Sequence, residues 1–126
     1  VDVNEIFMIL GFILGLIGWG IETLGDWQLW RFKQKSENRG KIFNQGLWAW
    51  TRHPNYFGES LVWWGMGLMA ASQGLWLGLA SPLLMTWLLI RVSGVKMTER
   101  KMIEDRPQYA EYVSRVPAFF PRKPKK

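Results

Sequence analysis

The segment Trp50–Ser60, "WTRHPNYFGES", brings side chains of several different chemistries close together. Arg52 can hold a phosphate at two points through its planar guanidinium. His53, the only histidine of the chain, can donate a hydrogen bond or, when protonated, add a second positive charge. Asn55 offers both a donor and an acceptor to an amide. These residue types indicate a site for an anion and an amide.

Pro54 predicts that a helix begins at this point, because proline disfavours helix for the residue before it and suits the first helical turn. On such a helix Asn55 and Glu59 share one face, and Tyr56 lies beside it. The arginine and the histidine then stand just before the helix N-terminus, where backbone N–H groups favour an anion. We therefore expect a phosphate-bearing cofactor here. The alternative is that the histidine is structural and the arginine only reaches towards the membrane surface.

The elements that must position these side chains are strongly apolar. Ile6–Leu24 contains one charged residue, Glu22, and is long enough to span the hydrocarbon core of a bilayer. Tyr56–Ile90 is also mostly apolar, with a natural turn at "ASQG", Ala71–Gly74. The sequence predicts an all-α polytopic membrane protein with three transmembrane helices, at about residues 6–24, 56–71 and 75–90.

The basic residues predict how these helices are oriented. All sixteen Lys and Arg lie in two segments, Arg31–Arg52 and Arg91–Lys126. Because basic residues mark the cytoplasmic side of a membrane, residues 26–54 and 91–126 are predicted to be cytoplasmic. We expect one membrane domain over residues 1–126, in a bacterial inner membrane or an endoplasmic reticulum-type membrane. Its expected partners are the lipid bilayer and an apolar small-molecule substrate, with no nucleic acid.

Further polar groups lie at the predicted cytoplasmic helix ends. Glu22 and Asp26 are four residues apart and share a helix face, while Arg91 stands where the last transmembrane helix ends. In the functional interpretation these carboxylates accept hydrogen bonds from a ligand. In the alternative one they are solvated or paired with Arg31 or Lys33, and Arg91 only marks the topology.

Three stretches of the sequence resemble one known family. "GLWAWTRHPNYFGE" resembles the signature of the steroid 5-alpha-reductase-like membrane proteins, especially their bacterial branch of uncharacterised members. "ETLGDWQLWRFK" upstream and "ERKMIEDRPQYAEYVSRVPAFFP" downstream match that branch in order and approximate spacing. The resemblance therefore covers nearly the whole chain. A looser form of "RHPNYFGE" is similar to a motif in sterol C14-reductases and isoprenylcysteine carboxyl methyltransferases.

The resemblance implies a membrane-embedded reductase that uses NADPH and acts on the CH–CH group of an enone or another unsaturated, lipid- or steroid-like substrate. It implies that this chain is the C-terminal part of a longer reductase and forms most of the cofactor cradle. In the steroid enzymes the catalytic Glu and Tyr belong to the N-terminal half, so no residue here is predicted to be catalytic.

The resemblance also implies which residues contact the cofactor. Four match polar positions at the cofactor site of the steroid reductases: Asp26, Asn55, Glu59 and Arg91. The arginine and histidine of the motif match the bacterial branch, whereas the animal steroid enzymes depart there. With the neighbouring tyrosine, the predicted cofactor-binding set is Asp26, Arg52, His53, Asn55, Tyr56, Glu59 and Arg91.

Two other functions are compatible with the same motif. A membrane methyltransferase that uses S-adenosylmethionine, of the isoprenylcysteine type, would share the helix-end site but would need no pocket for several phosphates. The basic segment "RFKQKSENRGK", Arg31–Lys41, favours the nucleotide. The other possibility is a non-enzymatic membrane subunit. Because the chain has no cysteine, a Cys-ligated metal is excluded, and no metal site is expected.

Overall fold

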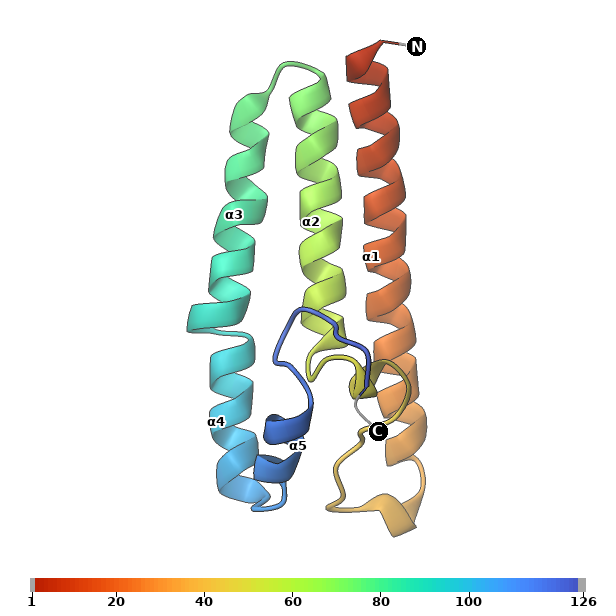
Figure 1. Ribbon diagram of the computed structural model, residues 1–126, viewed down its shortest axis with the longest axis vertical. Coiled ribbons are helices and arrows are strands. Elements are labelled where there is room, and N and C mark those ends of the chain that lie inside the picture. The colour runs from red at the N-terminus through yellow and green to blue at the C-terminus, as the bar shows by residue number, and fades with distance from the viewer. Residues whose placement is uncertain (1, 125–126) are drawn as a thin grey trace.

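The computed structural model describes residues 2–124 of the chain, and every regular element in that range is helical. The predicted all-α class is therefore confirmed. Figure 1 shows α1, α2 and α3 running side by side, with α2 in the middle and α4 continuing from α3. The helices are α1 (Val3–Lys33), α2 (Pro54–Ser72), α3 (Ala80–Trp87), α4 (Val95–Asp105) and α5 (Tyr109–Arg115).

The first helix extends beyond the predicted range of 6–24 at both ends. At its start, the Asp2 carboxylate accepts a hydrogen bond from the Glu5 N–H at 2.8 Å and caps the helix. At its other end α1 continues to Lys33, into the segment predicted to be a cytoplasmic connection. There Phe32 packs against Phe43 of the following loop, with ring centroids 4.9 Å apart. This tertiary contact gives the polar end of α1 a surface to pack on.

Glycines seven residues apart bring α1 and α2 into close contact. Gly11 and Gly18 of α1 are buried, as are Gly58 and Gly65 of α2. A Cβ atom on Gly18 would lie 2.5 Å from the carbonyl oxygen of Gly58, and one on Gly65 would lie 2.5 Å from that of Gly11. No side chain fits between the two backbones. Small residues permit this close packing of apolar helices.

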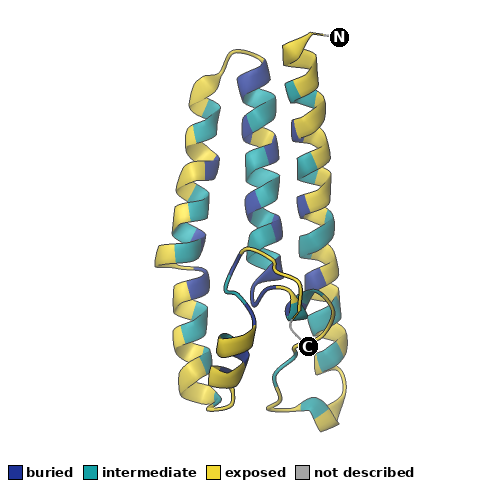
Figure 2. Ribbon diagram, in the orientation of Figure 1, coloured by how far each residue is buried: buried dark blue, intermediate teal, exposed yellow. Residues whose placement is uncertain are grey.

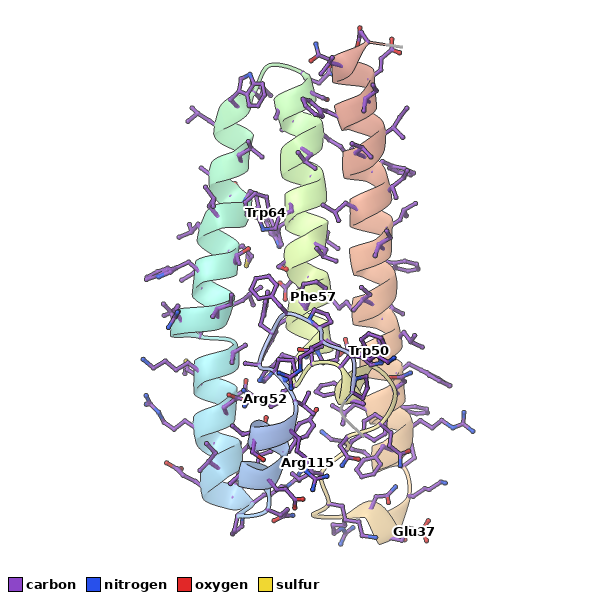
Figure 3. The ribbon with its side chains drawn as sticks, in the orientation of Figure 1. Glu37, Trp50, Arg52, Phe57, Trp64 and Arg115 are labelled. Atoms are coloured by element: carbon purple, nitrogen blue, oxygen red, sulfur yellow. The ribbon has the colours of Figure 1, made fainter. Side chains whose placement is uncertain are left out.

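The second helix begins at Pro54, as predicted, with His53 as its N-cap residue. It ends at Ser72, and the turn that follows contains Gly74 with φ +87°, a conformation that suits glycine. Trp64 of α2, labelled in Figure 3, donates a hydrogen bond to Thr86 Oγ1 of α3 at 2.9 Å. The middle helix is therefore tied to both of its neighbours.

The predicted helix 75–90 is divided into several parts. A 3₁₀ turn at Trp76–Leu79 precedes α3, and a π turn at Leu88–Val92 separates it from α4. A Cβ atom on Gly94 would lie 2.6 Å from the carbonyl oxygen of Leu89. The backbone is thus tightly folded where α3 gives way to α4. The segment 91–126, which was predicted to be cytoplasmic, begins within this π turn, and its residues 125 and 126 lie outside the described range.

Two helical stretches, Val3–Lys33 and Trp76–Asp105, are long and apolar enough to cross a membrane. In the most apolar 18 residues of each stretch, only 11% and 22% of the residues are buried. Figure 2 shows that the outer sides of α1 and α3 are largely exposed. Three such helices were predicted. Pro54–Ser72 does not qualify, because the polar residues of its first two turns lower its mean hydropathy.

Candidate functional site

A cavity of about 640 Å³ lies where the end of α1, the loop after it, the start of α2, and α4 and α5 meet. Its lining residues are drawn from segments that are far apart in the sequence. Figure 1 shows these segments gathered at one end of the molecule, the end at which α2 begins. The fold therefore places the polar segments of the chain around one hollow.

The lining of the cavity carries a strong excess of positive charge. Its six basic residues are Lys33, Lys35, Arg39, Lys41, Arg52 and Arg106. No aspartate or glutamate is among the lining residues described. Within residues 2–124, Arg52 is the member of this set that forms an ion pair with an acidic side chain. A concave surface with charge of one sign concentrates ligands of the opposite sign, so the cavity suits an anion.

Aromatic side chains form another part of the lining. Phe43 lies between Phe32 and Trp48, with ring centroids 4.9 Å from the first and 6.5 Å from the second. The Trp48 Nε1–H donates to the Gly25 carbonyl of α1 at 2.9 Å, which fixes the indole. Rings held in this way can pack against a planar ring of a ligand.

Behind the cavity, Glu99 of α4 accepts three hydrogen bonds on one carboxylate oxygen. Arg52 donates the shortest and also forms an ion pair with Glu99. His53 Nε2 lies 3.3 Å from the same oxygen, and the Tyr109 hydroxyl donates to it at 3.1 Å. The donors come from the loop before α2, the N-cap of α2 and the start of α5. One carboxylate therefore joins three parts of the site.

The protonation states of this cluster follow from its surroundings. Burial alone would raise the pKa of Glu99, but the hydrogen bond with His53 and the charge of Arg52 outweigh it, so the pKa lies below its ordinary value of 4.5. Burial, with the nearby Glu99 carboxylate, raises the pKa of Tyr109 well above its ordinary value of 10. At neutral pH Glu99 is therefore an anion and Tyr109 a neutral donor.

The C-terminal segment holds the loop before α2 in place. The Arg52 Nε–H donates to the Val116 carbonyl at 2.9 Å, and the Arg52 backbone N–H donates to the Pro117 carbonyl at the same distance. The Thr51 hydroxyl donates to the Phe119 carbonyl at 2.8 Å. Figure 3 shows Arg52 just below the start of α2, where this segment crosses the loop. Arg52 is thus held on both sides and is only 8% exposed.

Four of the seven predicted cofactor-binding residues line the cavity: Arg52, His53, Asn55 and Tyr56. The rings of His53 and Tyr56 are stacked, with centroids 5.2 Å apart. The Tyr56 hydroxyl is 2.9 Å from Thr98 Oγ1, which also lines the cavity. Asn55 accepts a hydrogen bond from the Tyr56 N–H through its side-chain oxygen at 3.0 Å. The structure places these residues together, and their role in binding a cofactor stays a prediction.

The other three predicted residues are not among the lining residues described. Asp26 is exposed on α1, and Arg91 is exposed in the π turn. Glu59 is half-buried on α2, close enough to Glu22 of α1 for the two carboxylates to repel each other. Within residues 2–124 no ion pair joins Asp26 or Glu22 to a basic residue; the alternative partner Arg31 lies over the Trp27 ring instead.

Sequence reasoning missed the residue at the centre of the cluster. Nothing in the local sequence distinguishes Glu99 from the other charged residues of its helix or indicates a partner in the loop before α2. The "YAEYVSRVPAFF" stretch carries a clearer signal, because its spaced aromatic residues favour packing against another surface. Tyr109, Tyr112 and Phe119 are buried, whereas Phe120 is 66% exposed, and the Tyr112 hydroxyl donates to the Trp48 carbonyl. Among residues 2–124, no group of three or more His, Cys, Asp or Glu side chains could hold a metal ion.

Comparisons with known proteins give a family and three relatives. The model of a family described as "Protein of unknown function (DUF1295)" matches residues 2–116. The chain is 34% identical over 101 residues to an uncharacterised protein of Schizosaccharomyces pombe, covering 73% of the chain and 27% of that protein. It is 30% identical over 110 residues to the cobalt-zinc-cadmium resistance protein CzcN of Cupriavidus metallidurans, covering 86% of the chain and 48% of the relative.

A third relative is named as a probable enzyme. The chain is 31% identical over 81 residues to the probable O-methyltransferase ustE of Ustilaginoidea virens, which covers 64% of the chain and 28% of that protein. The chain therefore spans about half the length of one relative and about a quarter of the other two. No solved structure matches it significantly.

Proposed function

The chain belongs to the DUF1295 family, which includes steroid 5-alpha-reductase-like proteins, and on this premise we propose that it forms the cofactor-binding part of a membrane-embedded, NADPH-dependent reductase. The proposed substrate is an unsaturated apolar molecule, such as an enone of a lipid or steroid. When bound, NADPH would supply the hydride that reduces the carbon–carbon double bond.

The observation that carries this proposal is the cavity with six basic and no acidic lining residues among those described. NADPH carries a pyrophosphate and a third phosphate, together with two planar ring systems. The donor set fits these groups, since Lys33, Lys35, Lys41 and Arg106 can bind phosphate oxygens. The aromatic residues beside them can contact a ring, and Asn55 can bind an amide. This chain would therefore bind and orient the cofactor.

We further propose that α1, α2 and α3 all cross the bilayer and that the cavity opens at the cytoplasmic side. The stretches Val3–Lys33 and Trp76–Asp105, of which the second includes α3, have the required length and apolarity, and α2 lies between α1 and α3 (Figure 1). Because the chain has no cysteine, single introduced cysteines can report the topology. Cysteines at Asp2 and Ser72 should react with an impermeant reagent from outside the cell. Cysteines at Ser36 and Ser114 should not, and external labelling of Ser36 would contradict the orientation.

A second candidate, an S-adenosylmethionine-dependent methyltransferase, is favoured by the relative named as a probable O-methyltransferase. S-adenosylmethionine carries a sulfonium cation and no phosphate, so the six basic residues of the lining would attract it less than they attract NADPH. The basic lining therefore favours the nucleotide over this cofactor.

Equilibrium titration of the full-length protein in nanodiscs with each cofactor separates the two candidates. We expect saturable binding of NADPH that weakens as salt is added, because charges that contact phosphates are screened. S-adenosylmethionine should bind more weakly or not at all. Saturable binding of S-adenosylmethionine without binding of NADPH would replace the reductase with the methyltransferase. Absence of binding of both would reject an enzyme of either kind.

A further inference from the structure

The six positive charges of the cavity are not equivalent. Arg52 forms an ion pair with Glu99, and both side chains are largely removed from solvent, with 9% and 16% of their surfaces exposed. His53, which is 3% exposed, contacts the same carboxylate. The remaining hydrogen bond from the Arg52 Nε goes to the Val116 carbonyl. The positive charge at this end of the cavity is therefore already matched by an anion that belongs to the protein.

The other end of the cavity is different. Within residues 2–124, no ion pair involves Lys33, Lys35, Arg39 or Lys41, although all four line the cavity. Figure 3 shows Glu37, which lies within this stretch of the loop, well separated from Arg52 near the start of α2. Arg106 belongs with the loop end, because its guanidinium donates to the Lys41 carbonyl at 3.4 Å. Positive charge without an internal partner is thus concentrated at the loop.

From this asymmetry we propose that Glu99 is a positioning residue that neutralises the Arg52–His53 end of the cavity and directs the anionic groups of a ligand to the Lys33–Lys41 end. The proposal rests on the proposed function in one respect, that the ligand carries phosphates. It assigns Arg52 a role opposite to the one its sequence context predicts. Arg52 holds Glu99 and the C-terminal segment, and it leaves the phosphates to the lysines.

The same reasoning gives the direction in which a nucleotide lies. Its phosphates would be at the loop, among basic side chains that form no ion pair within residues 2–124. The uncharged, amide-bearing ring would lie at the other end, beside Asn55 and the stacked rings of His53 and Tyr56. An unpaired Arg52 would attract the phosphates to this second end, so Glu99 decides which orientation is bound.

A double-mutant cycle on Arg52 and Glu99 tests the proposal, with NADPH and inorganic pyrophosphate as separate probes of the full-length protein in nanodiscs. Arg52→Gln leaves Glu99 as an unpaired anion behind the cavity, so both probes should bind about tenfold more weakly. Glu99→Gln leaves Arg52 unneutralised, so both should bind more tightly. In the double variant both charges are absent, and binding should return to within about twofold of the wild-type value.

If Arg52 instead contacts phosphate directly, the double variant will bind as weakly as Arg52→Gln alone, and the proposal is overturned. A change that merely loosens the fold would also not be rescued by the second substitution. Glu111→Gln is the matched control, because this carboxylate on α5 is 70% exposed and pairs with Arg115. It should leave both affinities unchanged.

Folding of each variant is checked by thermal unfolding followed through tryptophan fluorescence. Should the buried variants not fold, the exposed pair Lys35→Gln and Lys41→Gln provides a second test. Together these should weaken pyrophosphate binding by about tenfold or more, and unchanged binding would overturn the proposal. If pyrophosphate follows the cycle but NADPH does not bind, the role of Glu99 stands and the reductase fails. If NADPH binds but the double variant is not rescued, the reductase stands and the role of Glu99 fails.

Discussion

The contact between α1 and α2 and the junction around Glu99 are stabilised in opposite ways. The helix pair is held by backbones in contact, with glycines where any side chain would collide. The junction is held by one carboxylate that accepts hydrogen bonds from an arginine, a histidine and a tyrosine. The helix pair is stable because side chains are absent from the contact, whereas the junction is stable because four particular side chains are present.

This difference has a consequence for function. Close packing of glycines fixes the relative position of the two helices and presents no side chain that could bind a ligand, so this contact serves as a rigid support. A buried ionic cluster contributes little net stability in general but is costly to break once one partner is removed. The polar side chains that could contact a ligand therefore lie around the junction, and the helix pair fixes where the junction lies.

Removal of the carboxylate should have the largest effect. Glu99→Ala leaves the buried Arg52 without its counter-charge, and we expect a loss of about 3–5 kcal/mol in the free energy of unfolding. Thermal or denaturant unfolding in detergent measures it, and Glu111→Ala on the exposed face of α5 is the control. A loss equal to that of the control would mean that the ion pair does not hold the junction together.

A substitution in the contact between α1 and α2 should have the next largest effect on stability. Gly18→Ala places a methyl group 2.5 Å from the Gly58 carbonyl oxygen, so we expect a loss of about 1–3 kcal/mol. Gly20→Ala is the matched control, because nothing lies within 4 Å of its added Cβ. Since alanine favours helix over glycine by about 1 kcal/mol, the control should be neutral or slightly stabilising. Equal effects at both positions would contradict close packing of α1 on α2.

A smaller change probes the edge of the junction. Tyr112→Phe removes the hydroxyl that donates to the Trp48 carbonyl and leaves this buried acceptor unpaired. We expect a loss of about 1–3 kcal/mol, at the lower end of that range if water reaches the carbonyl. The unfolding temperature measures the loss, and NADPH affinity should also fall because Trp48 lines the cavity. An unchanged unfolding temperature would show that the hydrogen bond is dispensable.

Lowering the pH should destabilise the junction around Glu99 but not the contact between α1 and α2, and we expect this effect to be the smallest of the four. The pKa of Glu99 is lowered in the folded state by its facing groups, His53, Arg52 and Tyr109, against the opposing effect of burial. Ionised Glu99 therefore stabilises the folded protein fully when the pH is above 4.5, the pKa of this group in the unfolded chain. The stabilisation is lost as the pH falls through the lower pKa of the folded state. Stability of the wild-type protein should fall between about pH 5 and 3, and Glu99→Gln should show less of this fall.

The two regions also differ in how far sequence could predict them. The helix start at Pro54 was predictable, because proline acts on its immediate neighbours. So was the grouping of Arg52, His53, Asn55 and Tyr56, since residues adjacent on one helix start stay adjacent in space. The partner of Arg52 was not predictable, because Glu99 is 47 positions away and nothing local distinguishes it from other charged residues of its helix.

The remaining differences have similar causes. The end of α1 was placed too early, because the tertiary contact between Phe32 and Phe43 that supports its last turns is not visible in local hydropathy. The predicted end of the third helix at residue 90 falls inside the π turn between α3 and α4, but the turn itself was not predicted, since it leaves no mark on the apolar pattern. Local rules therefore predicted the start of α2 at Pro54 and its end to within one residue, whereas a contact between distant segments decided where α1 ends.

The central claim is that the basic end of the cavity binds the phosphates of a nucleotide. Its most direct test is an NADPH titration of the full-length protein and of the variant Lys33→Gln/Lys35→Gln/Lys41→Gln, each at low and high salt. We expect the wild-type protein to bind and to lose affinity with salt, and the variant to bind at least about tenfold more weakly with little salt dependence. Equal affinity of the two proteins at both salt concentrations would contradict the claim.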